Sequence, residues 1–295
     1  MRTREQLDAV IKAYDVRGVV GEDIDENFVR DTGAAFAAIL REEGENTVAV
    51  GHDMRPSSPS LARAFAEGVT SQGLNVTLLG LTSTDELYYA AGSLECAGAM
   101  FTASHNPAKY NGIKLCRAGA VPVGQETGLG QIKQMLIEGT PEYTGTEGAI
   151  AEQEILAGYA DFLRKLVPLE DSKPLVVAVD AANGMGGHTV PAVFDGLPFE
   201  VRDLYFELDG TFPNHEANPL DPKNLVDLQK FTVEQGADIG LAFDGDADRC
   251  FVVDERGEPV TPSAITALVA QREVDRAVAA GASAQDVAVV HNAIA

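Results

Sequence analysis

The chain has 295 residues, of which 45% are hydrophobic, and its 22 basic and 45 acidic residues give a formal net charge of −23. This length favours about two domains with part of another, and the strong negative charge argues against a nucleic-acid partner because it repels a phosphate backbone. No apolar run approaches the length of a membrane span, and the N-terminus lacks the apolar segment of a secretory signal.

Apolar, β-branched runs alternate with helical patterns along the chain, which predicts an α/β fold. Strands are predicted within four apolar runs, at 47–57, 175–187, 237–249 and 286–295. Helices are predicted at 28–43, 60–72, 152–167, 223–235 and 263–280. Continuous apolar strands of this kind are typical of parallel sheets that are covered on both faces.

Three cysteines, Cys96, Cys116 and Cys250, lie in apolar stretches. A small, odd number of cysteines in such surroundings favours buried, reduced thiols over disulfides. We therefore expect a cytoplasmic protein.

Residues 101–115, FTASHNPAKYNGIKL, allow two interpretations. As a hairpin, they would close one strand at Phe101, turn at Asn111 and Gly112, and then begin the next strand. That interpretation leaves the Ser-His-Asn-Pro run at 104–107 unexplained, although polar side chains also gather at ordinary turns. On local grounds both interpretations stay open.

Two stretches are predicted to be irregular. Residues 137–153 are rich in Gly, Thr, Pro and Glu, which is typical of an exposed connection between domains. Residues 212–224 hold three prolines and three asparagines, which predicts a long loop before a helix. Loops of that length are often functional.

The strongest chemical signal is the segment DGDADR at 244–249. Asp244, Asp246 and Asp248 alternate, and three carboxylates this close repel one another unless a cation neutralises them. Hard oxygen ligands favour Mg²⁺ or Ca²⁺. A solvated acidic turn between two strands is the plain alternative. With a metal present, Arg249 beside it would help to bind a phosphoryl group.

Three other motifs fit less well. A calcium-binding EF-hand loop that began at Asp244 would need Gly where the chain has Arg249, and its flanks would be helices. ELDGT at 207–211 resembles the nucleophile motif of haloacid-dehalogenase-type phosphatases, but it has Glu207 where that motif needs Asp. A serine hydrolase is disfavoured because Ser104 lacks the G-x-S-x-G elbow.

Two motifs, in order along the chain, identify a family resemblance. TASHNP at 102–107 together with DGDADR at 244–249 resembles the α-D-phosphohexomutase family, at its phosphomannomutase/phosphoglucomutase branch. YDVRG at 14–18 is similar to the N-terminal signature of that branch, and NGIK at 111–114 and the loop at 212–224 stand where the family has them. The resemblance extends over nearly the whole chain.

The resemblance implies tandem related α/β units with mixed sheets, because the family has four domains around a cleft and the first three are related. Residues 1–150 would form the first domain with a phosphoserine loop, 151–254 the second with a metal-binding loop, and 255–295 the start of a third. Nothing resembles the family's sugar-specificity loop or its last phosphate-binding loop. We therefore expect a fragment whose third unit is incomplete and whose fourth is absent.

The resemblance also implies a reaction and a metal. Ser104 would be the phosphoserine, and Asp244, Asp246 and Asp248 would hold one Mg²⁺ with the seryl phosphate as a further ligand. The phosphoserine would give its phosphoryl group to a hexose 1-phosphate or 6-phosphate of mannose or glucose. The resulting hexose 1,6-bisphosphate, which also serves as activator, would turn over in the cleft and return its other phosphate.

Five further side chains receive roles from the same resemblance. Arg249 would steady the transferred phosphoryl group, and Tyr14, Arg17 and Lys114 would line the cleft that binds the phosphosugar. Lys114 and His105 are the candidates for proton transfer. Positioning and charge neutralisation would supply most of the catalysis. We expect a monomer or a weak homo-oligomer without nucleic acid or membrane as partner.

Two alternatives stay open. Phosphoglucosamine mutase shares both core motifs, but it typically begins with a Gly-Thr-Asp-Gly run where this chain has KAYDVRG at 12–18, which favours mannose or glucose phosphates. A metal-binding α/β module without turnover is the alternative that is not an enzyme, and the missing domains are its support.

Two expectations concern the three-dimensional structure. Ser104 and the acidic cluster should meet in one cleft at the carboxyl ends of their sheets, where open α/β sheets bind ligands. The last strand, at 287–291, has no helix after it, so apolar surface should be exposed and the chain should tend to self-associate.

Overall fold

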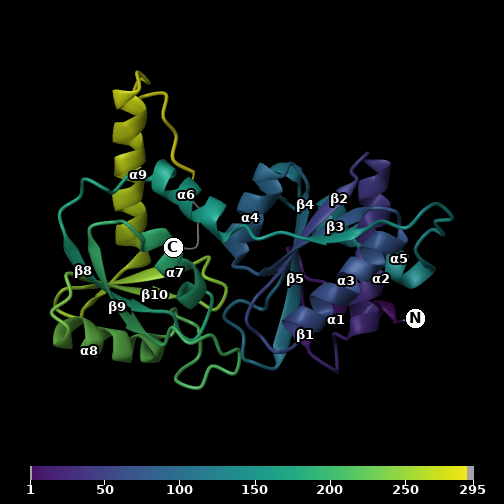
Figure 1. Cartoon of the computed structure of the whole chain (residues 1–295), viewed down its shortest axis with the longest axis horizontal. Helices are drawn as coiled ribbons and strands as arrows, with labels where there is room; N and C mark the ends of the chain where they lie inside the picture. The colour runs from purple at the N-terminus through teal and green to yellow at the C-terminus, as the bar shows by residue number, and fades with distance from the viewer. Residues whose placement is uncertain (1, 291–295) are drawn as a thin grey trace.

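The computed structural model of the protein describes residues 2–290. These residues form two β-sheets that lie side by side, with helices packed against each (Figure 1). Each sheet contains both parallel and antiparallel neighbours. The predicted fold class, tandem α/β units with mixed sheets, is therefore confirmed.

The first sheet has the strand order β1-β5-β4-β2-β3-β7, and β6 pairs with β5. β2 runs parallel to β3 and β4, and β3 runs parallel to β7. β5 runs antiparallel to β4, β1 and β6. The strands are β1 Val16–Val19, β2 Thr47–His52, β3 Asn75–Leu81, β4 Ala97–Phe101, β5 Tyr110–Arg117, β6 Val121–Pro122 and β7 Ile150–Glu152.

The second sheet repeats this arrangement. Its strands are β8 Leu175–Asp180, β9 Phe199–Leu204, β10 Ile239–Phe243, β11 Cys250–Asp254 and β12 Pro259–Val260. The order β9-β8-β10-β11-β12 matches the order β3-β2-β4-β5-β6, and every pair of neighbours has the same relative direction in both sheets. The β4–β5 connection and the β10–β11 connection therefore occupy equivalent positions.

The helices confirm the predicted pattern and add to it. Within residues 2–290 they are α1 Arg4–Val10, α2 Glu26–Glu42, α3 Ser58–Ser71, α4 Thr84–Ser93, α5 Gly130–Glu138, α6 Leu156–Leu166, α7 Gly186–Phe194, α8 Val226–Glu234 and α9 Pro262–Ala279. Short helical turns are η1 Ala118–Ala120, η2 Gln125–Leu129 and η3 Pro222–Leu225. The five predicted helices correspond to α2, α3, α6, α8 and α9, with ends shifted by a few residues. The loop expected at 212–224 contains no strand and no helix before η3.

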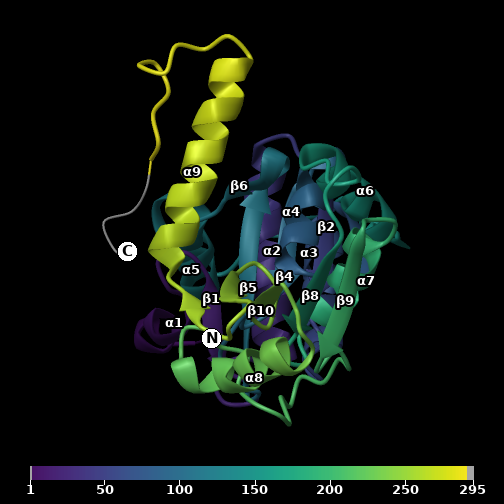
Figure 2. The same cartoon turned by 90° about the vertical axis from the view of Figure 1, so that its left-hand side faces the viewer.

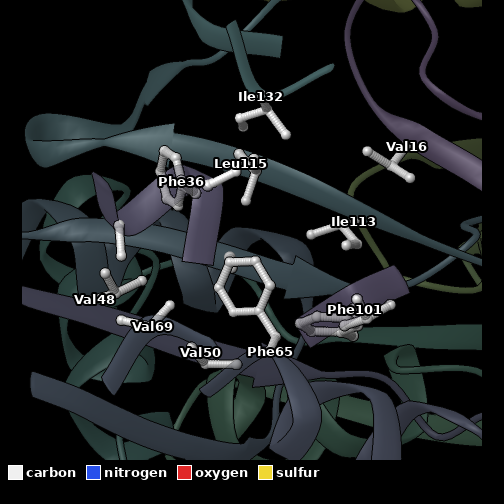
Figure 3. Packing of buried hydrophobic residues seen from close by; sticks show 14 of the residues in the cluster. Val16, Phe36, Val48, Val50, Phe65, Val69, Phe101, Ile113, Leu115 and Ile132 are labelled. Atoms are coloured by element: carbon white, nitrogen blue, oxygen red, sulfur yellow. The ribbon is translucent and has the colours of Figure 1, made fainter. Parts of the chain in front are cut away.

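Alternating side chains of the first sheet build two cores, one on each face. Figure 3 shows Val48 and Val50 of β2 on the side of α2 and α3, packed with Phe65 and Phe101. The rings of Phe65 and Phe101 meet edge to face, with centroids 5.5 Å apart. Ala49, which points the other way, belongs to the core under α4. Helices therefore cover both faces of this sheet.

The hairpin interpretation is correct in that one strand closes at Phe101 and pairs antiparallel with the next, but its turn at Asn111 and Gly112 is wrong. Both residues lie inside β5, where Gly112 pairs with Arg17 and Asn111 pairs with Gly18 of β1. A Cβ on Gly112 would lie 2.3 Å from the carbonyl oxygen of Val16, so glycine is required there by the close approach of β1. Long-range strand pairing has overridden the local turn preference.

The end of the described chain also differs from the expectation. Residues 287–290 of the strand predicted at 287–291 contain no strand, and residue 291 lies outside the described residues. Apolar side chains are nevertheless exposed there, as expected, with Val290 94% exposed. They are also exposed on α9, which projects away from both sheets in Figures 1 and 2 and leaves Leu268 67% and Val269 55% exposed.

The three cysteines do not all have the predicted burial. Cys96 and Cys116 are buried free thiols, as predicted, but Cys250 is exposed because it begins β11 at the edge of the loop before it.

None of the helices within residues 2–290 combines the length and the apolar character that a membrane crossing requires.

Candidate active site

Two equivalent connections, one from each sheet, meet at Ser104 and Asp244. Ser104 lies in the β4–β5 connection and Asp244 directly follows β10. The hydroxyl of Ser104 donates a hydrogen bond to Oδ2 of Asp244 over 2.8 Å, although the residues are 140 positions apart. The fold thus brings together the two motifs that the sequence places on different α/β units, at the carboxyl ends of β4 and β10.

The approach of the two connections is close because Gly245 has no side chain. A Cβ at that position would lie 2.5 Å from the carbonyl oxygen of Ser104. Ser104 itself is buried and has a φ of 51°, a left-handed conformation that costs free energy in a residue other than glycine. Other contacts must therefore hold this loop in place.

Arg55 supplies those contacts, and the sequence analysis missed it. Its guanidinium is fully buried and donates to the carbonyl oxygens of Ser104 at 2.9 Å, Asn106 at 2.7 Å, Pro107 at 3.0 Å and Tyr110 at 3.1 Å. A guanidinium has five N–H donors in a fixed planar arrangement, so one side chain can order a whole loop.

Asp53 holds Arg55 in turn. Its Oδ2 accepts from Nε of Arg55 at 3.1 Å, and its Oδ1 accepts from the hydroxyl of Ser58 at 2.6 Å. The side-chain amide of Asn111 donates to Ser58 at 2.9 Å, which extends the network into β5. The signal in the sequence was an Asp-x-Arg spacing directly after an apolar strand, the same position at which acidic residues follow β10.

The three predicted metal ligands form a compact group. One carboxylate oxygen from each of Asp244, Asp246 and Asp248 lies within 4.8 Å of the others. Oδ1 of Asp246 is buried and has no hydrogen-bond partner among residues 2–290. Since a buried carboxylate oxygen is costly without a partner, and since oxygen atoms are what Mg²⁺ prefers, these side chains fit a divalent cation.

Two basic side chains balance part of this charge. Nζ of Lys114 donates to Oδ2 of Asp246 at 2.6 Å and to Oδ2 of Asp248 at 2.7 Å. Nη2 of Arg249 lies 2.5 Å from both Oδ2 of Asp244 and Oγ of Ser104. Positive charge is therefore concentrated beside the serine, within a molecule that is strongly acidic as a whole.

The carboxylates differ in protonation. Burial raises the pKa of Asp244 to about 7, and the charge of Asp246 acts in the same direction. Burial also acts to raise the pKa of Asp246, but the charge and hydrogen bond of Lys114 more than offset it and hold that pKa below its usual range. Burial lowers the pKa of Lys114, while Asp246 and Asp248 raise it by more, so this amine stays protonated at neutral pH.

Thr84, at the start of α4, is a second residue that the sequence analysis missed. Its hydroxyl donates to Oδ2 of Asp246 at 2.6 Å, and its N–H donates to the carbonyl oxygen of Asp246 at 3.2 Å. The positive end of the α4 dipole is thus close to this carboxylate. The signal was the Ser-x-x-Glu capping box at 83–86, in which Ser83 and Glu86 bond reciprocally.

An open cavity of about 320 Å³ lies in front of these groups, and its lining is given by six residues: Arg17, Ser104, His105, Lys114, Asp248 and Arg249. Nδ1 of His105 lies 3.4 Å from Oγ of Ser104 and 2.7 Å from Nη2 of Arg249. Burial and the charges of Arg249 and Arg17 hold the pKa of His105 below its ordinary value, which leaves the imidazole neutral at pH 7.

Eight of the nine predicted site residues are thus brought together, and Tyr14 is the exception. Tyr14 is 82% exposed and is not part of the cavity lining within residues 2–290. Arg17 reaches the serine loop through Nη1, which donates to Oδ1 of Asn106 at 2.8 Å. The roles assigned to all nine residues stay predictions.

Models of two protein domains match the chain. Residues 8–140 match "Phosphoglucomutase/phosphomannomutase, alpha/beta/alpha domain I", and residues 157–257 match the corresponding domain II. The first of these ranges contains Ser104 and the second contains the three aspartates.

Individual relatives are similar over most of the chain. A phosphomannomutase/phosphoglucomutase of Pseudomonas putida is 40% identical over 91% of this chain, and a phosphoglucomutase of Neisseria meningitidis serogroup B is 37% identical over 90%. The chain spans 57% of the length of each of these relatives. The crystal structure of a phosphoglucomutase/phosphomannomutase family protein from Burkholderia thailandensis superposes with a TM-score of 0.85 at 31% identity, over 94% of this chain and 60% of that one.

Proposed function

The chain belongs to the phosphoglucomutase/phosphomannomutase family, and we propose that it carries the phosphoryl-transfer site of an enzyme that interconverts hexose 1-phosphates and hexose 6-phosphates. The observation that carries the proposal is the environment of Ser104, whose Oγ lies 2.8 Å from Asp244 and 2.5 Å from Arg249. A hydroxyl between a metal-ligand carboxylate and a guanidinium is suited to carry a phosphoryl group.

Mg²⁺ is the cofactor that the proposal requires. Asp244, Asp246 and Asp248 would hold it, and the unpartnered Oδ1 of Asp246 offers one ligand atom. When bound, Mg²⁺ supplies positive charge against the oxygens of a phosphoryl group. Lys114 and Arg249 would add positive charge from the protein side, and each contacts two of the three carboxylates.

The first transfer moves the phosphoryl group from Oγ of Ser104 to a free hydroxyl of the sugar phosphate. The bond from phosphorus to Oγ breaks as the bond from phosphorus to the sugar oxygen forms. The hydroxyl proton passes to the neutral imidazole of His105, and Arg249 stabilises the negative charge left on Oγ. Lys114, which stays protonated, binds the phosphate and neutralises charge rather than accepting a proton.

The second transfer reverses these movements on the hexose 1,6-bisphosphate. Oγ of Ser104 attacks the other phosphorus, the bond from that phosphorus to the sugar oxygen breaks, and His105 returns its proton to the oxygen. Atoms and charges therefore balance over one cycle. Arg17 lines the cavity and would contact a phosphate in either orientation of the sugar.

The substrate proposed is mannose or glucose phosphate, bound from a cytoplasmic pool. The cavity beside Ser104 offers the cations Arg17, Lys114 and Arg249 to an anionic ligand, which the acidic surface as a whole would repel. The free thiols Cys96 and Cys116 fit a reducing compartment. The protein acts as a monomer or weak homo-oligomer in this proposal.

Phosphoryl uptake by this chain tests the proposal. The chain is incubated with Mg²⁺ and a hexose 1,6-bisphosphate that carries labelled phosphate, and the labelled residue is mapped. We expect the label on Ser104, its loss in Ser104→Ala, and slower uptake in Asp244→Asn. Ser60→Ala, at an exposed serine of α3, is the matched control and should keep the label.

Label on any other residue, or unchanged uptake in Ser104→Ala, would contradict a phosphoserine enzyme. Turnover of mannose 1-phosphate, glucose 1-phosphate and glucosamine 1-phosphate then separates the sugars. Label uptake without turnover of any of the three would limit this chain to the transfer half-reaction.

A further inference from the structure

Residues 210–217 of the second unit, here called the bridging segment, contact the side chain that orders the serine loop of the first. The ring of Phe212 lies against the guanidinium of Arg55, with 5.1 Å between the ring centroid and Cζ. Every nitrogen of this guanidinium already donates a hydrogen bond within the first unit, so the ring covers the flat face that remains. A Cβ on Gly210 would lie 2.5 Å from Cα of Arg55, so the two backbones also approach closely.

The far end of the bridging segment lies beside the acidic loop at 244–249. Ala217 is buried, and a Cβ placed on Gly245 would lie 3.5 Å from the Cβ of Ala217. The same Cβ on Gly245 would lie 2.5 Å from the carbonyl oxygen of Ser104. The bridging segment therefore packs next to both connections that make up the candidate site.

His215 attaches the middle of the bridging segment to the second sheet. Its Nε2 lies 2.8 Å from Oδ2 of Asp180, the last residue of β8, and its Nδ1 lies 2.9 Å from the carbonyl oxygen of Glu216. Asp180 is buried, and its Oδ1 accepts the N–H of Ala182 at 2.8 Å. Both ring nitrogens of His215 thus face oxygen atoms at hydrogen-bond distance.

These two contacts define the charge of the imidazole ring. A carbonyl oxygen and an ionised carboxylate only accept hydrogen bonds, so both nitrogens must donate, which requires the imidazolium form. A neutral ring has one N–H, and its other nitrogen would turn a lone pair toward an oxygen at 2.8 or 2.9 Å. Loss of the proton therefore weakens the attachment of the bridging segment.

The groups around His215 favour the same charged form. Burial lowers the pKa of His215, but the hydrogen bond and the charge of Asp180 raise it by more, and the charge of Asp227 acts in the same direction. Tyr205 packs edge to face against the imidazole, with centroids 5.5 Å apart, and donates its hydroxyl to Oδ2 of Asp227 at 3.0 Å. Glu216, the acidic neighbour in the chain, is exposed. The pKa of His215 therefore lies above its ordinary value.

We propose that His215, as an imidazolium, is a positioning residue for Ser104. Its bond to Asp180 holds the bridging segment against Arg55, and Arg55 holds the serine loop. This inference rests on the proposed phosphoryl transfer at Ser104 and adds a dependence on pH to it. The attachment is complete below the unfolded pKa of a histidine and is lost as pH rises through the folded pKa.

The rate of label uptake by Ser104, followed from about pH 6 to about pH 9, tests the proposal. The parent and His215→Gln are compared at each pH, so that the pH dependence of the chemistry itself cancels. We expect His215→Gln to be about 10-fold slower at about pH 6, the order of one hydrogen bond to a charged group. At about pH 9 its rate should approach that of the parent, which also shows that the variant is folded. Lys223→Gln, at an exposed lysine of η3, is the control and should match the parent throughout.

Phe212→Leu tests the path through Arg55. It removes the ring from the face of the guanidinium but keeps an apolar side chain, so label uptake should fall. Adding His215→Gln to Phe212→Leu should then have little further effect, because both substitutions release the same contact. Fully additive effects would overturn the proposal, since His215 would then act by another route.

Hydrogen exchange separates this proposal from the proposed function. At about pH 6, the backbone amides of residues 102–111 and of the bridging segment should exchange faster in His215→Gln than in the parent. Faster exchange in both segments without label in the parent would contradict the phosphoryl transfer and still support the attachment. A ratio of uptake rates that does not change with pH, or faster exchange confined to the bridging segment, would overturn the proposal.

Discussion

Nη2 of Arg55 lies 2.9 Å from the carbonyl oxygen of Ser104, so a residue from the end of β2 fixes the backbone that presents the serine. Arg55 makes four such bonds to carbonyl oxygens of the serine loop and one ion pair with Asp53. The left-handed backbone of Ser104 is thereby maintained from outside its own loop.

Arg55→Met should destabilise the fold by about 3–5 kcal/mol, because it leaves Asp53 as an unpaired buried charge. Arg55→Lys keeps a charge but loses the planar set of donors, so it should also reduce phosphoryl uptake by Ser104. Urea denaturation measures the first effect and the labelling assay the second. Arg63→Met, at an exposed arginine of α3, is the control and should change neither. Wild-type stability in Arg55→Met would show that the buried pair does not hold the loop.

Asp246→Asn should weaken Mg²⁺ binding, because one charged ligand atom is removed from a group of three carboxylates. Titration calorimetry measures the affinity directly. Asp254→Asn changes the aspartate that ends the neighbouring strand β11 and should leave the affinity as it is. If Mg²⁺ bound equally well to Asp246→Asn and to the parent, the metal assignment would be wrong.

Gly245→Ala should reduce phosphoryl uptake, because its Cβ would lie 2.5 Å from the carbonyl oxygen of Ser104 and would force the two connections apart. The free energy of unfolding should fall by about 1–3 kcal/mol, as for other overpacked positions. Gly92→Ala, in α4 with open space around it, is the control and should be neutral or stabilising. Undiminished uptake in Gly245→Ala would contradict this view of the site.

His215 should make stability depend on pH. Burial lowers its pKa, but the hydrogen bond at 2.8 Å and the charge of Asp180 raise it by more, so the pKa lies above its ordinary value. The stabilisation is therefore complete below the unfolded pKa and is lost as pH rises through the folded pKa.

The difference in unfolding free energy between the parent and His215→Gln should accordingly shrink from about pH 6 to about pH 9. Denaturation at a series of pH values measures it, and an NMR titration of His215 should show its midpoint fall in Asp180→Asn. A difference that grew with rising pH would have the wrong sign for this pair.

The exposed apolar side of α9 should cause self-association. Leu268 and Val269 stand free of both sheets, and no residue of α9 is buried. Sedimentation should show species whose size depends on concentration. A hydrophobic dye should bind to the chain in a separate measurement. Leu268→Glu should reduce both, whereas Thr266→Glu, on the same helix at a polar position, should not. A monomer without dye binding would contradict the expectation.

The parts of the site that are local in sequence could be predicted. Alternating aspartates and a Ser-His-Asn-Pro run indicate their chemistry through residues a few positions apart. The binding of ligands at the carboxyl ends of open α/β sheets predicted that they would meet. Arg55 and Thr84 could not be assigned in this way, because their partners lie about 50 and more than 150 positions away. In the sequence alone, Arg55 looks like any other polar residue that follows a strand.

The errors have the same physical origin. Asn111 and Gly112 have a strong turn preference, but pairing with β1 places them inside a strand. Residues 287–290 have an apolar pattern, but none of the described strands pairs with them. Helix α7 begins with two glycines and contains Pro191, so its helical state depends on packing rather than on propensity. Tertiary contacts, or the lack of a pairing strand at 287–290, decided each case.

The equivalence of the two sheets has a mechanical consequence. The hydroxyl of Ser104 belongs to the connection after β4 and the acidic group to the connection after β10, so neither sheet alone holds both parts of the candidate site. A rigid-body rotation of one unit against the other would change the separation of Ser104 and Asp244 directly, with no intermediate element to absorb it. The proposed transfer site therefore depends on the relative orientation of the two units, and the Ser104–Asp244 distance reports that orientation.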